Sequence, residues 1–297
     1  MTKMLARSLS LHAPAKLNLY LAILGKRADG YHNLYTLFQR ISLFDEIRIV
    51  PADGKSPLLK VSGFPVPSDE SNLIVRAYRL LRSASSKTPL VSITLKKNIP
   101  VAAGLGGGSS DAGTFLDGMN RGFHLGLSCK KIGQLAAELG ADVPFFAMNR
   151  SCALGSGRGD LLRPISFSTR FWFAIASFPK GLSTKEIYCL YDSRKCRSSS
   201  LTKAKHDVSI LSNYLRQKDL SQIQCLLKND LLPICLHMKP AIKRVLNFMK
   251  QNGSQAISMS GSGPTCFAIL ENRYAAEKLA KAISCTFHLR VDIAHSF

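Results

Sequence analysis

Acidic residues are scarce in this sequence of 297 residues: 19 Asp and Glu stand against 40 Lys and Arg, and the formal net charge is +21. Such an excess of positive charge attracts nucleic acid, anionic membrane surfaces or small polyphosphates, and charge alone does not decide among them. The densest basic segment, residues 193–206, is rich in serine and lacks the aromatic residues that stack on nucleotide bases. We therefore expect a solvated loop there, and nucleic-acid binding is the remote alternative.

Long apolar runs are also missing. No stretch of about 18 or more consecutive apolar residues occurs, whereas a helix that crosses a bilayer needs about 20. The N-terminal residues lack the unbroken apolar core of a secretory signal. We therefore expect a cytoplasmic protein with no membrane partner. Heptads and repeats with a period of about 20 to 50 residues are absent too, which excludes coiled coils and solenoids.

Paired cysteines are a third absence. The eight cysteines occur singly, without any C-x-x-C pair at the spacing of a zinc finger or ribbon. A chain of this length with 46% hydrophobic residues can bury a core without disulfides. The cysteines are therefore interpreted as reduced thiols.

The first half of the chain shows both helical and strand periodicity. Apolar residues that alternate along the sequence predict strands at 17–23, 41–50 and 91–95. Apolar residues spaced three and four apart predict a helix over 73–81 and a second over 128–140, which Ser128 begins and Gly140 ends.

The second half repeats this mixture. A continuous apolar run predicts a buried strand at 171–178, and helical spacing predicts helices at 240–251 and 273–284. Two strands joined by a glycine turn are expected within 256–270, and a last strand at 286–293.

Strands and helices do not alternate regularly in either half, which favours an α+β fold in two lobes over a parallel sheet. The stretch 163–166 is the expected boundary. It divides the chain into an N-terminal domain over 1–163 and a C-terminal domain over 164–297.

A glycine run precedes a predicted helix, because four of the five residues 104–108 are glycine. Glycines at a helix start let backbone amides converge on an anion such as phosphate. A P-loop would need a lysine after the run, and a dinucleotide-binding fingerprint would need Gly or Ala where Ser109 stands. Both are excluded. Asp111 is interpreted as an acid in the first helical turn that complements the helix dipole.

This run, within residues 100–113, resembles the second motif of the GHMP kinases, which include galactokinase, homoserine kinase and mevalonate kinase. Four other segments match the family in its order and spacing: 13–47, 140–146, 155–160 and 258–270. The resemblance implies an N-terminal lobe like domain 2 of ribosomal protein S5 and a ferredoxin-like C-terminal lobe.

The opening segment 13–47 is similar to family members that act on a cytidine diphosphate-linked polyol. The resemblance implies that ATP, with Mg²⁺, phosphorylates the 2-hydroxyl of that polyol in the non-mevalonate route to isoprenoid precursors. A monomer or weak homodimer with small-molecule partners and no nucleic acid is expected. The alternative is a GHMP kinase with another alcohol acceptor, of the homoserine or mevalonate type.

The resemblance also implies the roles of single residues. Asp142 would be the general base, and Lys16 would lie between the acceptor hydroxyl and the γ-phosphate. Ser109 and Ser110 could bind phosphate oxygens, and Ser110 is the candidate Mg²⁺ ligand. The residues implied to bind ATP are Asn72, Lys97, Pro100, Val101, Ala102, Ala103, Gly104, Leu105, Gly106, Gly107, Gly108, Ser109 and Ser110.

Substrate recognition is implied for a separate set. Tyr31 and His32 would recognise cytosine, Tyr188 would close its other face, and Asn18 would contact the polyol. The turn at 261–265 is expected either to approach the glycine run and enclose the substrate or to be a simple hairpin turn. The remaining residues of the set are Thr184, Gly261 and Ser262.

Overall fold

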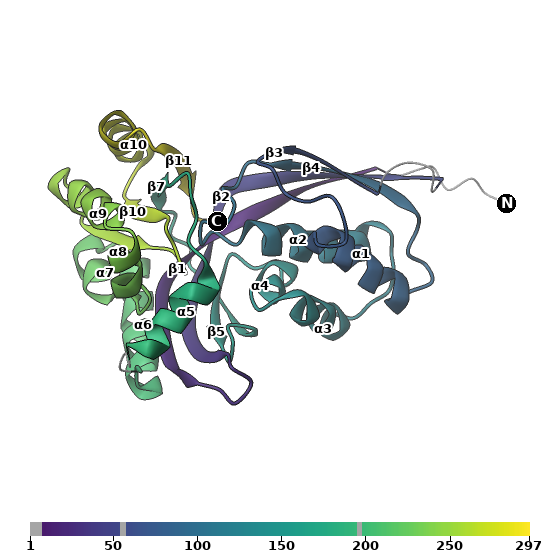
Figure 1. The fold of residues 1–297 in the computed structure, drawn as a ribbon, viewed down its shortest axis with the longest axis horizontal. Helices are drawn as coiled ribbons and strands as arrows, with labels where there is room; N and C mark the ends of the chain where they lie inside the picture. The colour runs from purple at the N-terminus through teal and green to yellow at the C-terminus, as the bar shows by residue number, and fades with distance from the viewer. Residues whose placement is uncertain (1–7, 54–57, 195–197) are drawn as a thin grey trace. The chain divides into compact units, whose positions relative to one another are not determined.

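The computed structural model describes residues 8–53, 58–194 and 198–297, which form two units (Figure 1). Neither unit is one continuous stretch of sequence. The first contains residues 8–15, Phe44–Val101 and Gly106–Arg150, and the second contains Lys16–Leu43, Ala102–Leu105 and Ser151–Phe297. The domain boundary expected near residue 163 stays a prediction.

The first unit packs helices on a small sheet. Strands β1 (Leu9–Lys26) and β2 (His32–Pro51) are long and contribute residues to both units. In the first unit β3 pairs in parallel with β4, β4 pairs antiparallel with β2, and α1 and α2 lie along one face of this sheet (Figure 1). The other elements are β3 (Leu59–Gly63), α1 (Leu73–Ala84), β4 (Val91–Lys97), α2 (Gly107–Gly122), α3 (Cys129–Leu139) and α4 (Val143–Ala147).

The observed start and end of α3 confirm those predicted from the sequence. The Ser128 side chain accepts a hydrogen bond from the amide of Lys131, and Gly140 is the C-terminal cap. The helix buries one apolar stripe because residues three and four apart share a face. That stripe joins the core between the sheet and the helices and consists of Ile132, Leu135, Ala136 and Leu139.

The second unit is built around an antiparallel sheet in the order β11-β7-β10-β9. Helices α9 and α10 pack on this sheet and close its apolar core (Figure 1). Its elements are β5 (Cys152–Ser156), β6 (Leu161–Ile165), β7 (Trp172–Ser177), α5 (Thr184–Ser193), α6 (Leu201–Gln217), α7 (Leu220–Leu226), β8 (Lys228–Asn229), α8 (Leu232–Met238), α9 (Ala241–Gln251), β9 (Ala256–Met259), β10 (Cys266–Leu270), α10 (Arg273–Phe287) and β11 (Arg290–His295).

A solvated loop was expected over 193–206. This prediction is wrong for residues 201–206, which are helical, and residues 195–197 lie outside the described residues. Helix α6 begins at Leu201, after Ser200 accepts a hydrogen bond from the amide of Lys203. An apolar stripe that starts at Ala204 continues beyond the basic segment and is buried. The basic residues of 201–206 are therefore the polar side of an amphipathic helix.

The last strand is shorter than predicted. Thr286 and Phe287 belong to α10, and β11 begins at Arg290. Helix α10 ends only where His288 adopts a left-handed backbone conformation, with a φ of 53°. The alternation of polar and apolar residues could not reveal the boundary between α10 and β11. Over so few residues, the end of a helix and the start of a strand can show the same alternation.

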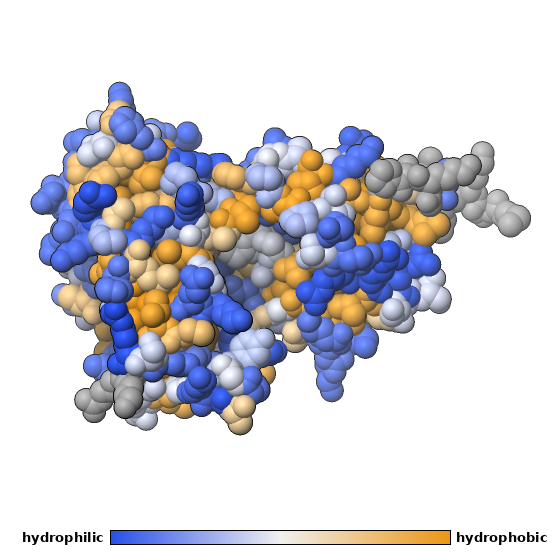
Figure 2. All heavy atoms as spheres, in the orientation of Figure 1, coloured by the Kyte–Doolittle hydropathy of each residue, from blue (hydrophilic) through white to orange (hydrophobic). Residues whose placement is uncertain are grey.

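No helix within the described ranges is both long and apolar enough to cross a bilayer. Figure 2 shows hydrophilic side chains interspersed with apolar ones over the drawn face of each unit.

Candidate active site

Helix α2 begins in the glycine run with no side-chain cap. Gly106 is the N-terminal cap, with a φ of 72°, in the left-handed region that glycine adopts without strain. The first intrahelical bond runs from the Ser110 amide to the Gly106 carbonyl, at 2.8 Å. The amides of Gly107, Gly108 and Ser109 therefore have no acceptor inside the helix. Together with the helix dipole they can bind an anionic phosphate.

Asp111 is not the first-turn acid that the sequence suggested. The helix starts at Gly107, so its first turn contains no acidic residue. Asp111 is buried instead, and its Oδ2 accepts a hydrogen bond of 2.6 Å from Lys97 Nζ. The expectation was wrong because one more turn of helix separates Asp111 from the exposed amides.

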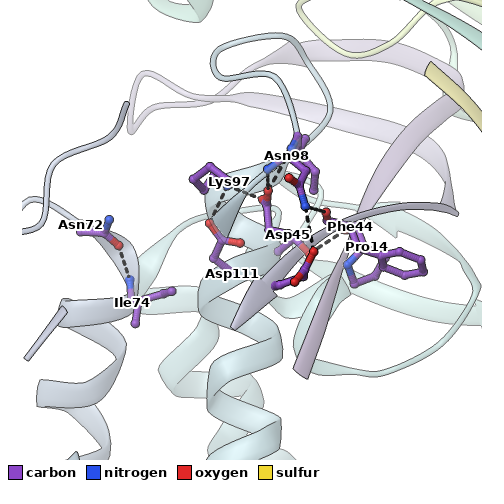
Figure 3. Close-up of polar contacts among 11 residues, drawn as sticks. Pro14, Phe44, Asp45, Asn72, Ile74, Lys97, Asn98 and Asp111 are labelled. Carbon is purple, nitrogen blue, oxygen red and sulfur yellow. Dashed lines mark hydrogen bonds and ion pairs between the residues drawn. The ribbon is translucent and has the colours of Figure 1, made fainter. Parts of the chain in front are cut away.

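Asp111 belongs to a buried ionic cluster with Asp45 of β2 and Lys97 of β4, shown in Figure 3. Lys97 Nζ pairs with a carboxylate oxygen of each acid. Asp45 Oδ1 also accepts hydrogen bonds from the amides of Asn98, at 2.6 Å, and Ile99, at 2.9 Å. Burial raises the pKa of Asp111 to about 8; the Asp45 charge adds to this rise and Lys97 opposes it.

The residues expected near adenine have structural partners. Asn72 is the N-terminal cap of α1: its Oδ1 accepts a hydrogen bond of 2.9 Å from the Ile74 amide (Figure 3). Its Nδ2 donates to the Pro67 carbonyl. Lys97 is only 3% exposed. Direct contact of either side chain with ATP stays a prediction.

Ser110 is fully buried, and its hydroxyl donates a hydrogen bond of 2.6 Å to the Pro14 carbonyl. It therefore attaches the first turns of α2 to β1 within the first unit. No cluster of three or more His, Cys, Asp or Glu side chains in the described part of the chain could hold a metal ion. Mg²⁺ is usually held by one or two carboxylates and the substrate's phosphates, so Ser110 as a Mg²⁺ ligand stays a prediction.

In the second unit the glycine run meets the turn between β9 and β10. Gly104 has a φ of 78°, and a Cβ there would lie 2.2 Å from the Ser260 carbonyl oxygen. Ser260 Oγ donates to the Gly104 carbonyl at 2.9 Å, and the Thr265 amide donates to the Ala103 carbonyl at 3.4 Å. The turn, which joins the antiparallel strands β9 and β10, thus approaches the glycine run as expected. That it encloses the substrate stays a prediction.

Lys16 and Asn18 of β1 lie at the same place. Lys16 Nζ donates to Asn18 Oδ1 at 2.5 Å, and Asn18 Nδ2 donates to Thr36 Oγ1 at 2.8 Å. A Cβ on Gly261 would lie 3.2 Å from Asn18 Oδ1 and 3.3 Å from Lys16 Nζ. The second unit therefore brings these three predicted site residues together. Asp142 precedes α4 in the first unit, and its pairing with Lys16 stays a prediction.

His32 and Tyr188, both expected to bind a pyrimidine, are in contact. Their rings are stacked with centroids 4.9 Å apart. Sequence reasoning missed Asp192, whose Oδ1 lies 2.7 Å from His32 Nε2 and whose Oδ2 accepts a hydrogen bond of 2.7 Å from Lys26. The hydrogen bond from Lys26 lowers the pKa of Asp192. The available signal was its position four residues after Tyr188, on the same face of α5.

Tyr31 is 57% exposed, and the Arg158 guanidinium lies 5.3 Å from the centre of its ring. Asp160 holds Arg158 through an ion pair of 2.8 Å. Thr184 Oγ1 and Ser262 Oγ form a hydrogen bond of 2.8 Å. All the residues expected to bind the acceptor substrate thus belong to the second unit.

Two family models match this chain. One, described as the N-terminal domain of GHMP kinases, matches residues 72–150, and one described as their C-terminal domain matches residues 211–289. A homoserine kinase from Cytophaga hutchinsonii has a similar structure, with a TM-score of 0.74, 19% identity, and coverage of 100% of this chain and 96% of that one. Similarity at that identity shows the fold alone.

Two proteins with higher sequence identity to this chain are named as the same kinase. The 4-diphosphocytidyl-2-C-methyl-D-erythritol kinase of Desulfotalea psychrophila is 38% identical over 96% of this chain and 94% of its own length. The crystal structure of a 4-(cytidine 5'-diphospho)-2C-methyl-D-erythritol kinase matches with a TM-score of 0.79 and 30% identity, over 97% of this chain and 99% of that one. The chain therefore belongs to the GHMP kinases and, within them, to the family of 4-diphosphocytidyl-2-C-methyl-D-erythritol kinases.

Proposed function

We propose that this protein transfers the γ-phosphoryl group of ATP to the 2-hydroxyl of 4-diphosphocytidyl-2-C-methyl-D-erythritol. The products are the 2-phosphate and ADP, in the non-mevalonate pathway to isoprenoid precursors. The observation that carries the proposal is the uncapped first turn of α2 on the glycine run, in a chain whose relatives bear that kinase name. A cytoplasmic location and a monomeric or weakly dimeric state stay predictions.

The nucleotide binds through its phosphates. The free amides of Gly107, Gly108 and Ser109 donate to phosphate oxygens, and the α2 dipole favours the negative charge. Mg²⁺ bound together with ATP would neutralise part of the phosphate charge, and Ser110 would be the residue that holds it. Ser110 holds the turn in place through the Pro14 carbonyl.

The reaction requires a hydroxyl that loses its proton as it attacks. In our proposal the 2-hydroxyl oxygen forms a bond to the γ-phosphorus while its proton moves to the Asp142 carboxylate. The bond from the γ-phosphorus to the bridging oxygen breaks, and ADP leaves. Lys16, held by Asn18, places an ammonium where negative charge develops on the oxygens.

The acceptor is selected by its cytosine ring. Tyr31 offers an exposed aromatic face, and the stacked rings of His32 and Tyr188 provide a further surface with a hydrogen-bonding edge. Asp192 fixes the His32 ring by accepting a hydrogen bond from Nε2. Homoserine or mevalonate would use none of these residues, so they favour the cytidine substrate over the alternative acceptors.

The test is ADP release from ATP with the cytidine substrate, compared with homoserine and mevalonate, together with phosphorus NMR of the product. We expect turnover of the cytidine substrate alone and a phosphate on its 2-oxygen. The Asp142→Asn variant should bind both substrates and lose most of kcat. Turnover of another alcohol in place of the cytidine substrate would refute the substrate assignment, and full activity of the variant would remove Asp142 as the base.

A further inference from the structure

We propose that Asn229 is a positioning residue for phosphoryl transfer and that it acts through the hydroxyl of Ser260. The inference rests on the proposed function, because it concerns the alignment of the acceptor with the phosphates of ATP. Neither residue was among the site residues expected from the sequence. Both belong to the second unit, and both are buried.

Asn229 is fixed by its own strand and by the residues that follow it. It is the last residue of β8, which pairs in parallel with β1 and places Asn229 opposite Leu21. The Asp230 amide donates a hydrogen bond of 3.0 Å to the Leu21 carbonyl. The Leu231 amide donates to Asn229 Oδ1, also at 3.0 Å. The side chain therefore has a defined place beside β1, the strand that contains Lys16.

The side-chain amide of Asn229 holds the turn between β9 and β10 on both sides of Ser260. Its Nδ2 donates one hydrogen bond to the Met259 carbonyl and one to the Gly261 carbonyl, each of 2.8 Å. A buried carbonyl that loses its donor is costly, because it has no water to replace it. The two hydrogen bonds of Asn229 therefore define the position of the residue between them.

Ser260 joins two segments that the proposed reaction uses. Its Oγ donates to the Gly104 carbonyl at 2.9 Å and accepts a hydrogen bond of 3.2 Å from the Asn18 amide. One fully buried hydroxyl thus sets the spacing between the glycine run and the strand that contains Lys16 and Asn18. A Cβ on the next residue, Gly261, would contact both of these side chains.

This spacing matters for the reaction more than for binding. In the proposed function the glycine run holds the phosphates, and β1 supplies the residues on the acceptor side. A misplacement of about 1 Å between reacting groups can lower the rate on the order of a hundredfold. The side chain of Asn229 bonds only to the backbone in the contacts that hold the turn. Its replacement therefore alters the alignment and leaves the side chains that contact the substrates in place.

The experiment compares kcat and the KM values for ATP and the cytidine substrate in the native protein and in Asn229→Asp. The substitution replaces the donating amide by an oxygen that faces two carbonyls. Gln39→Glu is the matched control: Gln39 is 5% exposed and Asn229 6%, both in the second unit. Its Nε2 likewise donates to two carbonyls, those of Arg40 and Ser151. Calorimetry of ATP binding counts the competent sites, and each kcat is divided by that number.

We expect kcat per competent site to fall on the order of ten- to a hundredfold in Asn229→Asp, with both KM values unchanged, and to keep the native value in Gln39→Glu. Ser260→Ala removes the bridging hydroxyl and should show the same loss. The double variant should lose no more than either single one, because the two residues act as a unit. Thermal unfolding shows whether each variant is folded. Should Asn229→Asp not fold, Asn229→Ala takes its place, with Gln39→Ala as its control.

A native kcat per competent site in the Asn229 variant or in Ser260→Ala would overturn the inference while leaving the kinase proposal intact. A rise in KM without a fall in kcat would overturn it too, because it would assign Asn229 to binding. Losses that multiply in the double variant would show that Asn229 does not act through Ser260. Absence of turnover of the cytidine substrate by the native protein would instead refute the proposed function.

Discussion

Gly104 combines two constraints on a single residue, a positive φ and a closely packed Cα. In Gly104→Ala the new Cβ would lie 2.2 Å from the Ser260 carbonyl oxygen. We expect the free energy of unfolding to fall by about 2–4 kcal/mol, and kcat/KM to fall with it because the glycine run moves.

Gly126→Ala is the matched control for this change. Gly126 has a similar φ of 75° but nothing within 4 Å of its Cβ position. Chemical denaturation should show a loss of only about 1–2 kcal/mol from backbone strain, and kcat/KM should not change. Equal losses in the two variants would show that strain, and not the contact with Ser260, decides the requirement for glycine.

Asp192 offers a second test at this scale. Asp192→Ala removes the acceptor for His32 and Lys26, and hydrogen bonds of charged groups contribute about 1.5–3 kcal/mol. Steady-state kinetics should show the KM for the cytidine substrate rising on the order of tenfold or more, with the KM for ATP unchanged. Asp219→Ala, which removes the cap of α7, is the control; a rise in both KM values would indicate general loosening.

Single residues also mark the limit of sequence reasoning. Lys16, Asn18 and Gly261 were predicted as site residues because each lies in a recognisable motif, and the structure places them close together. Their role in a site stays a prediction. Asp45 was missed, since an acid next to Glu46 in an alternating strand suggests a solvated position. Only the pairing of β2 with β4 places it beside Lys97.

Glycines in two helices differ in the space around their Cβ positions, and this difference can be tested by substitution with alanine. Gly133 of α3 has nothing within 4 Å of its Cβ position, whereas a Cβ on Gly113 of α2 would lie 2.7 Å from Phe146 Cβ and from the Val143 carbonyl oxygen. We expect Gly133→Ala to stabilise the protein by about 0.5–1 kcal/mol and Gly113→Ala to destabilise it by about 1–3 kcal/mol. Urea unfolding measures both; a loss of stability in Gly133→Ala would contradict the open surroundings of that residue.

Elements with their own start and stop residues were predicted well. Helix α3 has Ser128, Gly140 and a complete apolar stripe, and both bounds were correct. The junction of α10 and β11 was not, because it depends on the left-handed conformation of His288. The start of α6 was missed because its first turns are mostly basic and polar. The apolar stripe that indicates a helix lies mainly further along the chain.

At the scale of the whole molecule, the net charge of +21 makes an anionic substrate easier to capture. We expect kcat/KM for both polyanionic substrates to fall when NaCl is raised from about 20 mM to about 0.5 M, where the screening length becomes short. The value of kcat at saturation should stay constant and is the internal control. If kcat/KM does not change with salt, the excess positive charge lies too far from the substrate-binding site to attract the substrates.

The division into interleaved units has a consequence for synthesis on the ribosome. The first unit has all of its residues once Arg150 has been made, whereas the second needs residues 16–43 as well as β11, near the last residue of the chain. Strand β11 pairs with β7 along its whole length. Residues 16–43 are therefore made long before β7, β11 and the rest of their unit, and during that interval they are the part of the nascent chain most in need of protection from aggregation.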